Sequence, residues 1–289
     1  MKVATSIAQD GLSSPARLDW KVIEPRTGVF SVGMGEVWRY KELLYFFIWR
    51  DIKVRYKQTA LGALWVMLQP LCAMLIFTVV FGYFSKIPSD GLPYSIFAFT
   101  GLLPWTYFAQ AVIRGSGSLV AGSDLIRKVY FPRLIVPLGA VVSPLVDFFI
   151  SFVVMAALMG WFGIMPTASI AALPLFVLLS TVTALAITLW LSALNVKYRD
   201  VGHIVPFAVQ LLMFASPVVY PASIVPEAWR FIYGMNPMVA VIEGFRWALL
   251  GKGSLDPAML TMSTMVVAVL LCSGVWYFKR AERTFADII

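Results

Sequence analysis

The side chains that most often perform chemistry are scarce in this sequence. Its 289 residues include one histidine, His203, and two cysteines, Cys72 and Cys272, each inside an apolar stretch. These residues fit neither a zinc site nor a disulfide framework, so we expect no metal site. The single histidine stands in a charged loop, which does not suit a Ser-His-Asp triad, and we expect it at a helix end or an interface.

A nucleotide-binding motif is also missing. The nearest approach to the phosphate-binding pattern G-x-x-x-x-G-K-[ST] runs from Gly244 to Gly251-Lys252, has the wrong spacing, and continues with Gly253 and Ser254. No Gly-rich turn follows a strand pattern. We therefore expect this chain to bind no ATP through a P-loop and to hold no cofactor of its own.

Asp147 is the one ionisable residue deep inside an apolar stretch, three residues after Pro144. Such residues are costly in a membrane and often functional. Two hypotheses explain it, a proton relay and a structural hydrogen bond to a neighbouring helix. A relay normally has further ionisable members in other spans, and the sequence offers none, so the structural hydrogen bond is favoured.

Three carboxylates in the last third of the chain could in principle serve a transferase. They are Glu227, Glu243 and Asp256. Each has a basic residue nearby, and these are Arg230, Arg246 and Lys252. Solvated salt bridges, or the surface of a gate helix, explain the three carboxylates better than catalysis does.

The composition indicates that much of the chain lies in a lipid bilayer. Hydrophobic residues make up 60% and charged residues 13%, with a mean hydropathy of +0.82, against about 45–50% and about 25% in soluble domains. Long charge-free stretches without period-two alternation predict membrane-spanning helices rather than a barrel. We predict an all-α integral membrane protein with six spans, near residues 62–84, 93–113, 136–162, 170–194, 204–222 and 258–278.

The basic residues indicate how these spans are oriented. Six spans place both termini on one side, and that side holds 19 of the 23 lysines and arginines, in residues 1–61, 114–133, 195–203 and 279–289. By the positive-inside rule both termini are cytoplasmic, as in a multi-pass protein of the cytoplasmic (inner) membrane. The net charge of +8 thus needs no nucleic-acid partner.

The segment before the first span divides in two. Residues 1–34 form a polar extension, whereas apolar residues recur at helical spacing within 35–57 among many basic ones. We predict an amphipathic helix over 35–57 that lies in the cytoplasmic interface; the alternative is a helix packed on the rest of the protein. Residues 58–280 then form the transmembrane domain and residues 281–289 a cytoplasmic tail.

Residues 220–257 are too interrupted by proline to form a span, yet they are rich in aromatic residues. Two pieces, Pro226–Tyr233 and Pro237–Leu250, each have proline near the first turn of a short helix. We predict two re-entrant or gate helices before the last span, with an ordinary external loop as the alternative.

Several stretches resemble the permease subunit of ABC-2 type polysaccharide exporters, which move lipid-linked O-antigen, capsule or teichoic-acid chains. They occur in the order and spacing of that family from about residue 36 to the end. The stretches are WRDIKVRYKQTALG at 49–62, GLLPW at 101–105, LIRKVYFPR at 125–133, YRDV at 198–201, SPVVYP at 216–221, NP at 236–237 and GFR at 244–246.

The resemblance implies a transport subunit without ATPase activity of its own. Two copies would pair as a homodimer. Two separate ATP-binding subunits would dock on the cytoplasmic side, and these partners would bind ATP and Mg²⁺. It also implies a docking loop for those subunits, formed by Leu125, Ile126, Arg127, Lys128, Val129, Phe131 and Arg133. A basic rim around an apolar centre suits a partner interface, and contact with anionic membrane lipid is the alternative.

A polysaccharide route should be lined by aromatic, amide and hydroxyl groups. The resemblance places the first and fifth spans along the channel, where the candidate lining residues are Phe77, Phe81, Phe84, Phe207, Gln210 and Phe214. The candidates for an external gate are Trp229, Phe231, Tyr233, Asn236 and Pro237. The candidates for contact with the lipid head group, through charge-assisted bonds to its pyrophosphate, are Arg50, Lys53, Arg55 and Lys57.

Three alternative functions stay open from the residues. The first is an ABC-2 exporter of a drug or a small lipid. The second is a membrane glycosyltransferase or acyltransferase that uses the external carboxylates. The third is a proton-coupled flippase that uses Asp147.

Overall fold

The computed structural model describes residues 34–57, 62–252 and 256–288. The chain divides into a unit of residues 1–31 and a unit of residues 32–289, and all the described residues lie in the second unit. Apart from Met34, the predicted N-terminal extension lies outside the described residues. Those residues form helices and turns with no strand, which confirms the prediction of an all-α protein.

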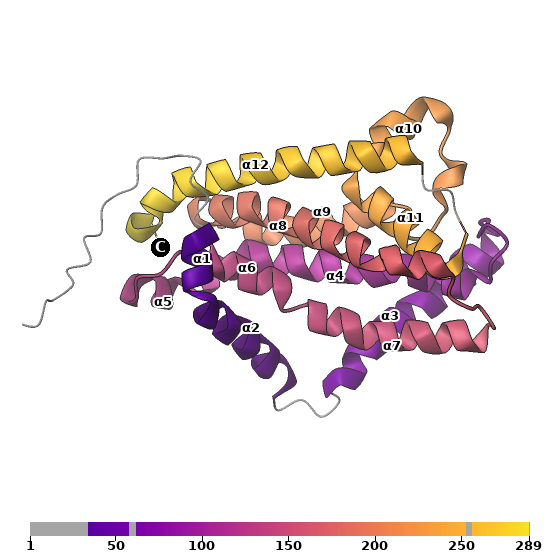
Figure 1. Ribbon diagram of the computed structural model, residues 1–289, viewed down its shortest axis with the longest axis horizontal. Coiled ribbons are helices and arrows are strands. Elements are labelled where there is room, and N and C mark those ends of the chain that lie inside the picture. Colours follow the sequence, from indigo (N-terminus) through magenta and orange to yellow (C-terminus); the bar gives the residue numbers. More distant parts are fainter. Residues whose placement is uncertain (1–33, 58–61, 253–255, 289) are drawn as a thin grey trace, which may run out of the picture. The chain divides into compact units, whose positions relative to one another are not determined.

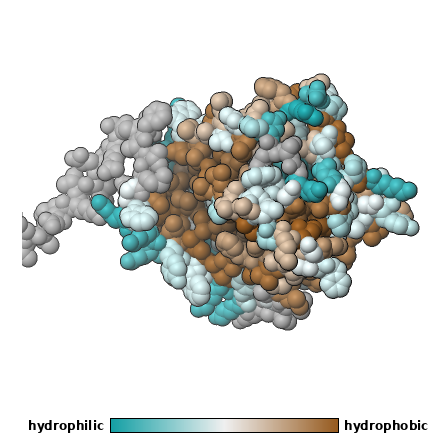
Figure 2. Space-filling model, turned by 45° about the vertical axis from the view of Figure 1, so that its right-hand side comes forward, coloured by the Kyte–Doolittle hydropathy of each residue, from teal (hydrophilic) through white to brown (hydrophobic). Residues whose placement is uncertain are grey.

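Five helical stretches are long and apolar enough to cross a membrane. They are α3 (Gly62–Phe77) continued by η1 (Thr78–Phe84), α4 (Tyr94–Ala121), α6 (Ile135–Val142) continued by α7 (Leu145–Trp161), η2 (Ala168–Ala172) continued by α8 (Leu173–Lys197), and α12 (Pro257–Ile288). These stretches coincide with five of the six predicted spans. The chain is therefore a multi-pass membrane protein, and Figure 2 shows the broad hydrophobic surface that such helices present.

The fifth predicted span, residues 204–222, is helical over only part of its length. Helix α9 (Val201–Phe214) is too short to meet the same length criterion, and turns follow it. Pro217 explains the end of the helix, because proline has no N–H to donate and keeps the residue before it out of the helical region. The prediction of a helical span near residues 204–222 is wrong for residues 215–221, which form no helix.

Helix α9 and the turn after it nevertheless run along α4 from near one end to near the other. At its start, the N–H of Gly202 donates to Asn195 Oδ1 over 3.0 Å, and the Asn195 amide donates to the carbonyl of Ser116 over 3.0 Å. Beyond its end, the hydroxyl of Tyr94 donates to the carbonyl of Val219 over 2.6 Å. Tyr94 and Ser116 lie near opposite ends of α4, so α9 and the turn after it are antiparallel to α4.

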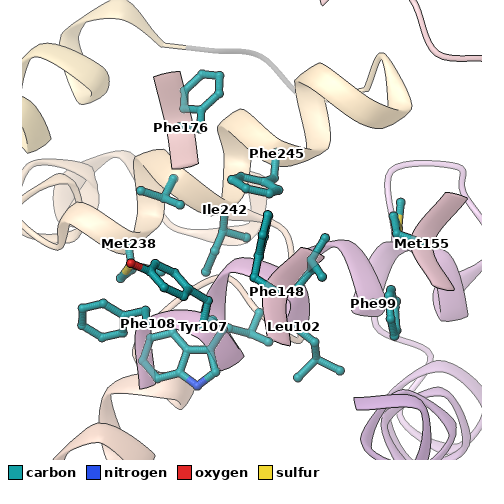
Figure 3. Packing of buried hydrophobic residues seen from close by; sticks show 14 of the residues in the cluster. Phe99, Leu102, Tyr107, Phe108, Phe148, Met155, Phe176, Met238, Ile242 and Phe245 are labelled. Atoms are coloured by element: carbon teal, nitrogen blue, oxygen red, sulfur yellow. The ribbon is translucent and has the colours of Figure 1, made fainter. Parts of the chain in front are cut away.

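Helix α4 is the centre of the described unit. Within its most apolar window 78% of the residues are buried, whereas the windows in the other four spans are 11–39% buried. A Cβ on Gly115 would come within 2.4 Å of the Thr188 methyl group, so this glycine lets α4 and α8 cross closely. Phe148 packs between Tyr107 and Phe245 at centroid distances of 6.1 and 5.9 Å, which joins α7 to both α4 and α11 (Figure 3).

One end of the unit gathers helices that are distant in sequence. Helices α1 (Met34–Arg39), α2 (Lys41–Tyr56) and α5 (Ser123–Lys128) meet the ends of α8 and α12 in one hydrophobic cluster (Figure 1). The predicted single helix over 35–57 is thus two helices joined at Tyr40. Phe47 of α2 is buried against Phe131, with a centroid distance of 5.8 Å, so this part of α2 packs on the protein.

The opposite end carries η3 (Ala222–Ile224), α10 (Glu227–Gly234) and α11 (Pro237–Leu250). The two short helices lie at the residues predicted for them. Asn236 caps α11 by accepting from the N–H of Met238 over 3.0 Å, and Gly251 ends it with a φ of 62°. Most of α10 is exposed, whereas α11 is buried along nearly its whole length.

Candidate functional site

Side chains of α4 and α11, and of the residue that caps α11, contact the turn formed by Ser216–Pro221, here called the 216–221 turn. Arg246 Nη2 donates to the carbonyl of Val218 over 3.1 Å, and Asn236 Nδ2 donates to Ser216 Oγ over 2.8 Å. The Tyr94 hydroxyl donates to the next carbonyl, that of Val219. Backbone that leaves a helix needs other hydrogen-bond partners, and these bonds supply them for the carbonyls of Val218 and Val219.

Arg246 is the largest charged side chain inside the protein. It is 2% exposed, its Nη1 lies 2.8 Å from Glu243 Oε1, and its guanidinium lies 3.7 Å from the ring centroid of Phe97. Burial lowers the pKa of Arg246, while the neighbouring Glu243 carboxylate acts in the opposite direction. The interpretation of this pair as a solvated salt bridge is therefore wrong, whereas the Glu227–Arg230 pair, at 3.6 Å, does lie at the surface.

Three of the stretches that carry the family resemblance meet at this point. A Cβ on Gly101 would lie 2.9 Å from the carbonyl oxygen of Val218 and 3.1 Å from Arg246 Nη2. The GLLPW stretch, the SPVVYP stretch and the GFR stretch therefore form one contact, which sequence spacing alone did not reveal. The available signal was an arginine and a glutamate one helical turn apart in an otherwise apolar segment.

Asp147 is held by the end of α2. Its carboxylate forms an ion pair with Arg55 and accepts a hydrogen bond from the Tyr56 hydroxyl. Burial, followed by the hydrogen bond and negative charge of Asp147, raises the pKa of Tyr56 to about 12, so this hydroxyl keeps its proton at neutral pH. The arrangement supports the hypothesis of a structural bond to another helix.

A pocket adjoins this ion pair. It lies between α3, α4 and α7 and is open to the outside of the protein, and only about 20 Å³ of it is cavity space. Its polar lining consists of Gln69, Thr106, Tyr107, Gln110, Asp147 and Ser151. This pocket, here called the inner pocket, is lined by Asp147, the ion-pair partner of Arg55.

Those four basic residues differ in their surroundings. Arg50 Nη2 lies 2.8 Å from Asp51 Oδ1, and its guanidinium lies 4.9 Å from the ring centroid of Phe47. Lys53 and Lys57 are exposed, while Arg55 is 14% exposed and paired with Asp147. The structure thus separates two exposed lysines from an arginine that faces the protein.

The predicted docking loop has an inner and an outer side. Ile126 and Phe131 are buried and Leu125 is half-buried, whereas Arg127, Lys128 and Val129 are exposed. Arg133 forms hydrogen bonds within the chain. Its guanidinium donates to the backbone carbonyl of Glu282, and its backbone N–H donates to the Glu282 carboxylate over 3.3 Å. Only the outer side, around Arg127–Tyr130, presents free side chains to a partner.

The candidate channel residues fall into two groups. Phe207, Gln210 and Phe214 are exposed along one side of α9, and Phe84 is 72% exposed. Phe77 and Phe81 contact each other at a centroid distance of 5.7 Å and pack on the core. The exposed group remains available to line a path, while the packed pair also supports the fold.

The candidate gate residues divide in the same way. Trp229 and Phe231 are 60% and 69% exposed. Tyr233 is half-buried, and burial raises the pKa of its hydroxyl, so the ring is uncharged. Asn236 and Pro237 cap and begin α11, which is a structural role.

The structure shows no obvious metal-binding centre in the ranges it describes. Over residues 34–57, 62–252 and 256–288, no three histidine, cysteine, aspartate or glutamate side chains come together. Cys72 and Cys272 are exposed free thiols.

Comparison with known proteins gives a consistent result. A family model described as "ABC-2 type transporter" matches residues 42–250. The chain is 32% identical over 256 residues to the O-antigen export system permease protein RfbA of Myxococcus xanthus, which covers 88% of this chain and 98% of that protein. The RfbA protein of Klebsiella pneumoniae is 27% identical, covering 86% and 95%, and the polysialic acid transport protein KpsM of Escherichia coli is 22% identical, covering 81% and 91%.

The matched region contains all of α2 except Lys41, together with the docking loop, the 216–221 turn and Arg246. The resemblance stated from individual stretches is thereby confirmed over most of the chain. The chain belongs to the ABC-2 type transporter family.

Proposed function

We propose that this chain is the permease subunit of an ABC transporter that exports a lipid-linked polysaccharide across the cytoplasmic membrane. The substrate would be of the O-antigen, capsule or teichoic-acid type. The observation that carries the proposal is the similarity to O-antigen export permeases across 88% of the chain. The chain itself would perform no ATP hydrolysis, and a separate ATP-binding subunit would supply it.

The assembly in this proposal contains two permeases and two ATP-binding subunits. Each permease crosses the membrane six times with both termini in the cytoplasm, and α9 with the 216–221 turn makes the fifth crossing. The α3 span supports pairing with a second copy, because only 11% of its apolar window is buried within this chain. The exposed aromatic side of α9 supports a channel wall.

The docking loop would transmit movement of the ATP-binding subunits. Its exposed cations would contact the partner, while Ile126 and Phe131 anchor it to α2, α8 and α12 through the cluster at that end of the molecule. Because Phe131 contacts Phe47, a displaced loop would also displace α2. The short external helices α10 and α11 would then gate the other end of the path.

Co-purification tests the proposal directly. A tagged permease, expressed with its genomic neighbours, should retain a P-loop ATPase in equal ratio, and a lipid-linked glycan should stimulate ATP hydrolysis by the complex. Nucleotide hydrolysis by the isolated permease, or transport without any ATPase partner, would contradict it. Stimulation by a drug-like amphiphile rather than by a glycan would instead support the small-molecule exporter.

A further inference from the structure

We propose that the carboxamide side chains of Gln69, Gln110 and Gln210 form a band that exchanges hydrogen bonds with the hydroxyl groups of the transported glycan. The identification of the ligand as a glycan rests on the proposed function. The band itself rests on the surroundings of the three side chains. The sequence indicates only Gln210 as a lining residue, and the structure adds the other two.

The structure divides the carboxamide side chains into two groups. The described residues contain two asparagines and three glutamines. The amides of Asn195 and Asn236 both donate to other groups of the protein, over 3.0 and 2.8 Å. Gln69 and Gln210 are exposed and form no hydrogen bond with any described residue. Since an amide outside water is costly without a partner, these two glutamines need partners that this chain does not supply.

All three glutamines belong to apolar helices. Gln69 is on α3, Gln110 on α4 and Gln210 on α9, and each stands in a stretch without lysine, arginine, aspartate or glutamate. An exposed hydroxyl on such a helix can bond to its own backbone, as the Thr264 hydroxyl does to the carbonyl of Leu260 over 2.8 Å. Among the described residues the amides of Gln69 and Gln210 have no such bond, so they suit a polar ligand better than lipid tails.

The three side chains lie at a similar depth. Gln69 and Gln110 both line the inner pocket. Gly202 of α9 and Ser116 of α4 are held at one level by hydrogen bonds to the same asparagine side chain. Gln210 follows Gly202 and Gln110 precedes Ser116, so in the antiparallel pair the two glutamines lie about 12 and about 9 Å from that level. The band therefore crosses α3, α4 and α9.

The lining of the inner pocket suits a hydroxyl group. Its cavity space of about 20 Å³ holds one water-sized group. Gln69, Thr106 and Gln110 contribute amide and hydroxyl groups to its wall. Gln110 Oε1 accepts from Arg114 over 3.1 Å, which leaves its Nε2 without a hydrogen bond to any described residue. A carboxamide both donates and accepts, and so does a sugar hydroxyl.

Helix α9 adds apolar contacts beside its amide. Phe207 and Phe214 are 63% and 49% exposed, and they precede and follow Gln210 at helical spacing on one side of the helix. A sugar ring has apolar C–H faces and hydroxyl edges, so aromatic rings and neutral amides together match it. Hydrogen bonds between neutral groups are individually modest, which allows a long chain to advance from one contact to the next.

The first test measures whether the band faces water. With Cys72 and Cys272 changed to serine, Gln69→Cys and Gln210→Cys are introduced singly, and the purified permease in nanodiscs is treated with a cationic methanethiosulfonate. Because only a hydrated thiolate reacts, both should be modified at least about tenfold faster than Val269→Cys, as followed by intact mass. Val269 is the matched control, since it is 63% exposed in the middle of the last predicted span. Modification as slow as that of Val269→Cys would overturn the proposal.

The second test measures export. Gln69→Leu and Gln210→Leu keep the side-chain size and remove the amide, so each should lower the rate of glycan export a few-fold. The double variant should lower it about tenfold, as expected for the loss of two hydrogen bonds. Gln69→Asn retains a carboxamide and should recover part of the rate. Thr264→Val, which removes an exposed hydroxyl bonded to its own helix, should export as the unmodified chain does.

The outcomes distinguish the glycan from the other surfaces that could meet these amides. Normal export by the double leucine variant would overturn the glycan contact. A lower dimer fraction in that variant, with an unchanged thermal midpoint, would assign the glutamines to contact between two copies and also overturn it. Slow cysteine modification with normal glycan export by the unmodified chain would remove the band and leave the exporter standing. Fast modification without any glycan export by the unmodified chain would instead contradict the proposed function and leave the hydrated band.

Discussion

The guanidinium of Arg246 lies over the ring of Phe97 at 3.7 Å, and both side chains are at most 2% exposed. A desolvated cation–π contact of this kind contributes about 2 kcal/mol. Because Phe97 belongs to α4 and Arg246 to α11, the contact joins the central span to the helix that follows the 216–221 turn. The same guanidinium bonds to that turn, so one side chain connects three segments.

Replacement of Arg246 should therefore destabilise the protein strongly. Arg246→Gln leaves Glu243 buried without its partner, and breaking such a pair costs about 3–5 kcal/mol. We expect a large fall in the thermal midpoint of the detergent-purified protein, measured by size-exclusion fluorescence. Arg246→Gln combined with Glu243→Gln should recover part of the loss, because it removes the uncompensated charge.

Arg230→Gln provides the matched control for this prediction. Arg230 and Glu227 have the same i, i+3 spacing at the same end of the molecule, but both are exposed. Surface pairs contribute roughly 0–1 kcal/mol, so the thermal midpoint should hardly move. Equal losses in Arg246→Gln and Arg230→Gln would show that burial of the first pair is not the cause.

Charge-free windows predicted where most spans lie, but not where their helices end. The predicted span 136–162 corresponds to Ile135–Trp161, whereas α4 continues to Ala121 instead of ending near residue 113, and α12 continues to Ile288 instead of ending near residue 278. Charge marks the edge of the hydrocarbon, and a helix can continue beyond that edge into water. Helix α9 departs in the other direction, because Pro217 ends it early.

The partners of the polar residues could not be predicted from spacing. Arg55 and Asp147 are 92 residues apart, and any of 23 basic residues was an equal candidate for the carboxylate. The sequence did indicate that a buried carboxylate needs a partner, which is a requirement of desolvation. Likewise, the sequence paired Glu243 with Arg246 by their opposite charges, but it did not predict that both are buried. Their burial depends on the helices that pack around α11, which a local pattern does not show.

Gly101 should not tolerate a side chain. The added Cβ of Gly101→Ala would lie 2.9 Å from the Val218 carbonyl oxygen, which is backbone held by the hydrogen bond from Arg246 and cannot easily shift. We expect a lower thermal midpoint and weaker glycan export. Gly117→Ala on the same helix has no atom within 4 Å of the new Cβ, and it should be neutral or stabilising by about 0.5–1 kcal/mol.

The proposed orientation can be measured by cysteine labelling. With Cys72 and Cys272 changed to serine, Lys128→Cys should react with a membrane-impermeant maleimide only after the cells are opened. Ala228→Cys on α10, also an exposed position, should react in intact cells. Reaction of Lys128→Cys from outside would contradict both the cytoplasmic docking loop and the positive-inside assignment.

Charge reversal on the outer side of the docking loop should separate the permease from its ATPase. Arg127→Glu with Lys128→Glu replaces two exposed cations without disturbing buried Ile126. Like charges placed across an interface cost several kcal/mol, so recovery of the ATPase in a pull-down should fall at least about tenfold. Lys41→Glu is a comparable exposed reversal outside the loop, and it should leave recovery unchanged.

The exposed side of α9 should influence export without supporting the fold. Phe207 and Phe214 are 63% and 49% exposed, so Phe207→Ala and Phe214→Ala remove little packing inside one subunit and should leave the thermal midpoint nearly unchanged. If these rings stack on sugar, the rate of glycan export should fall several-fold, because a stacking contact on an aromatic face contributes about 0.5–1.5 kcal/mol. Leu178→Ala, an equally exposed apolar residue on α8, should export at the wild-type rate. Equal slowing in all three variants would indicate that these side chains face lipid and that the path for sugar lies elsewhere.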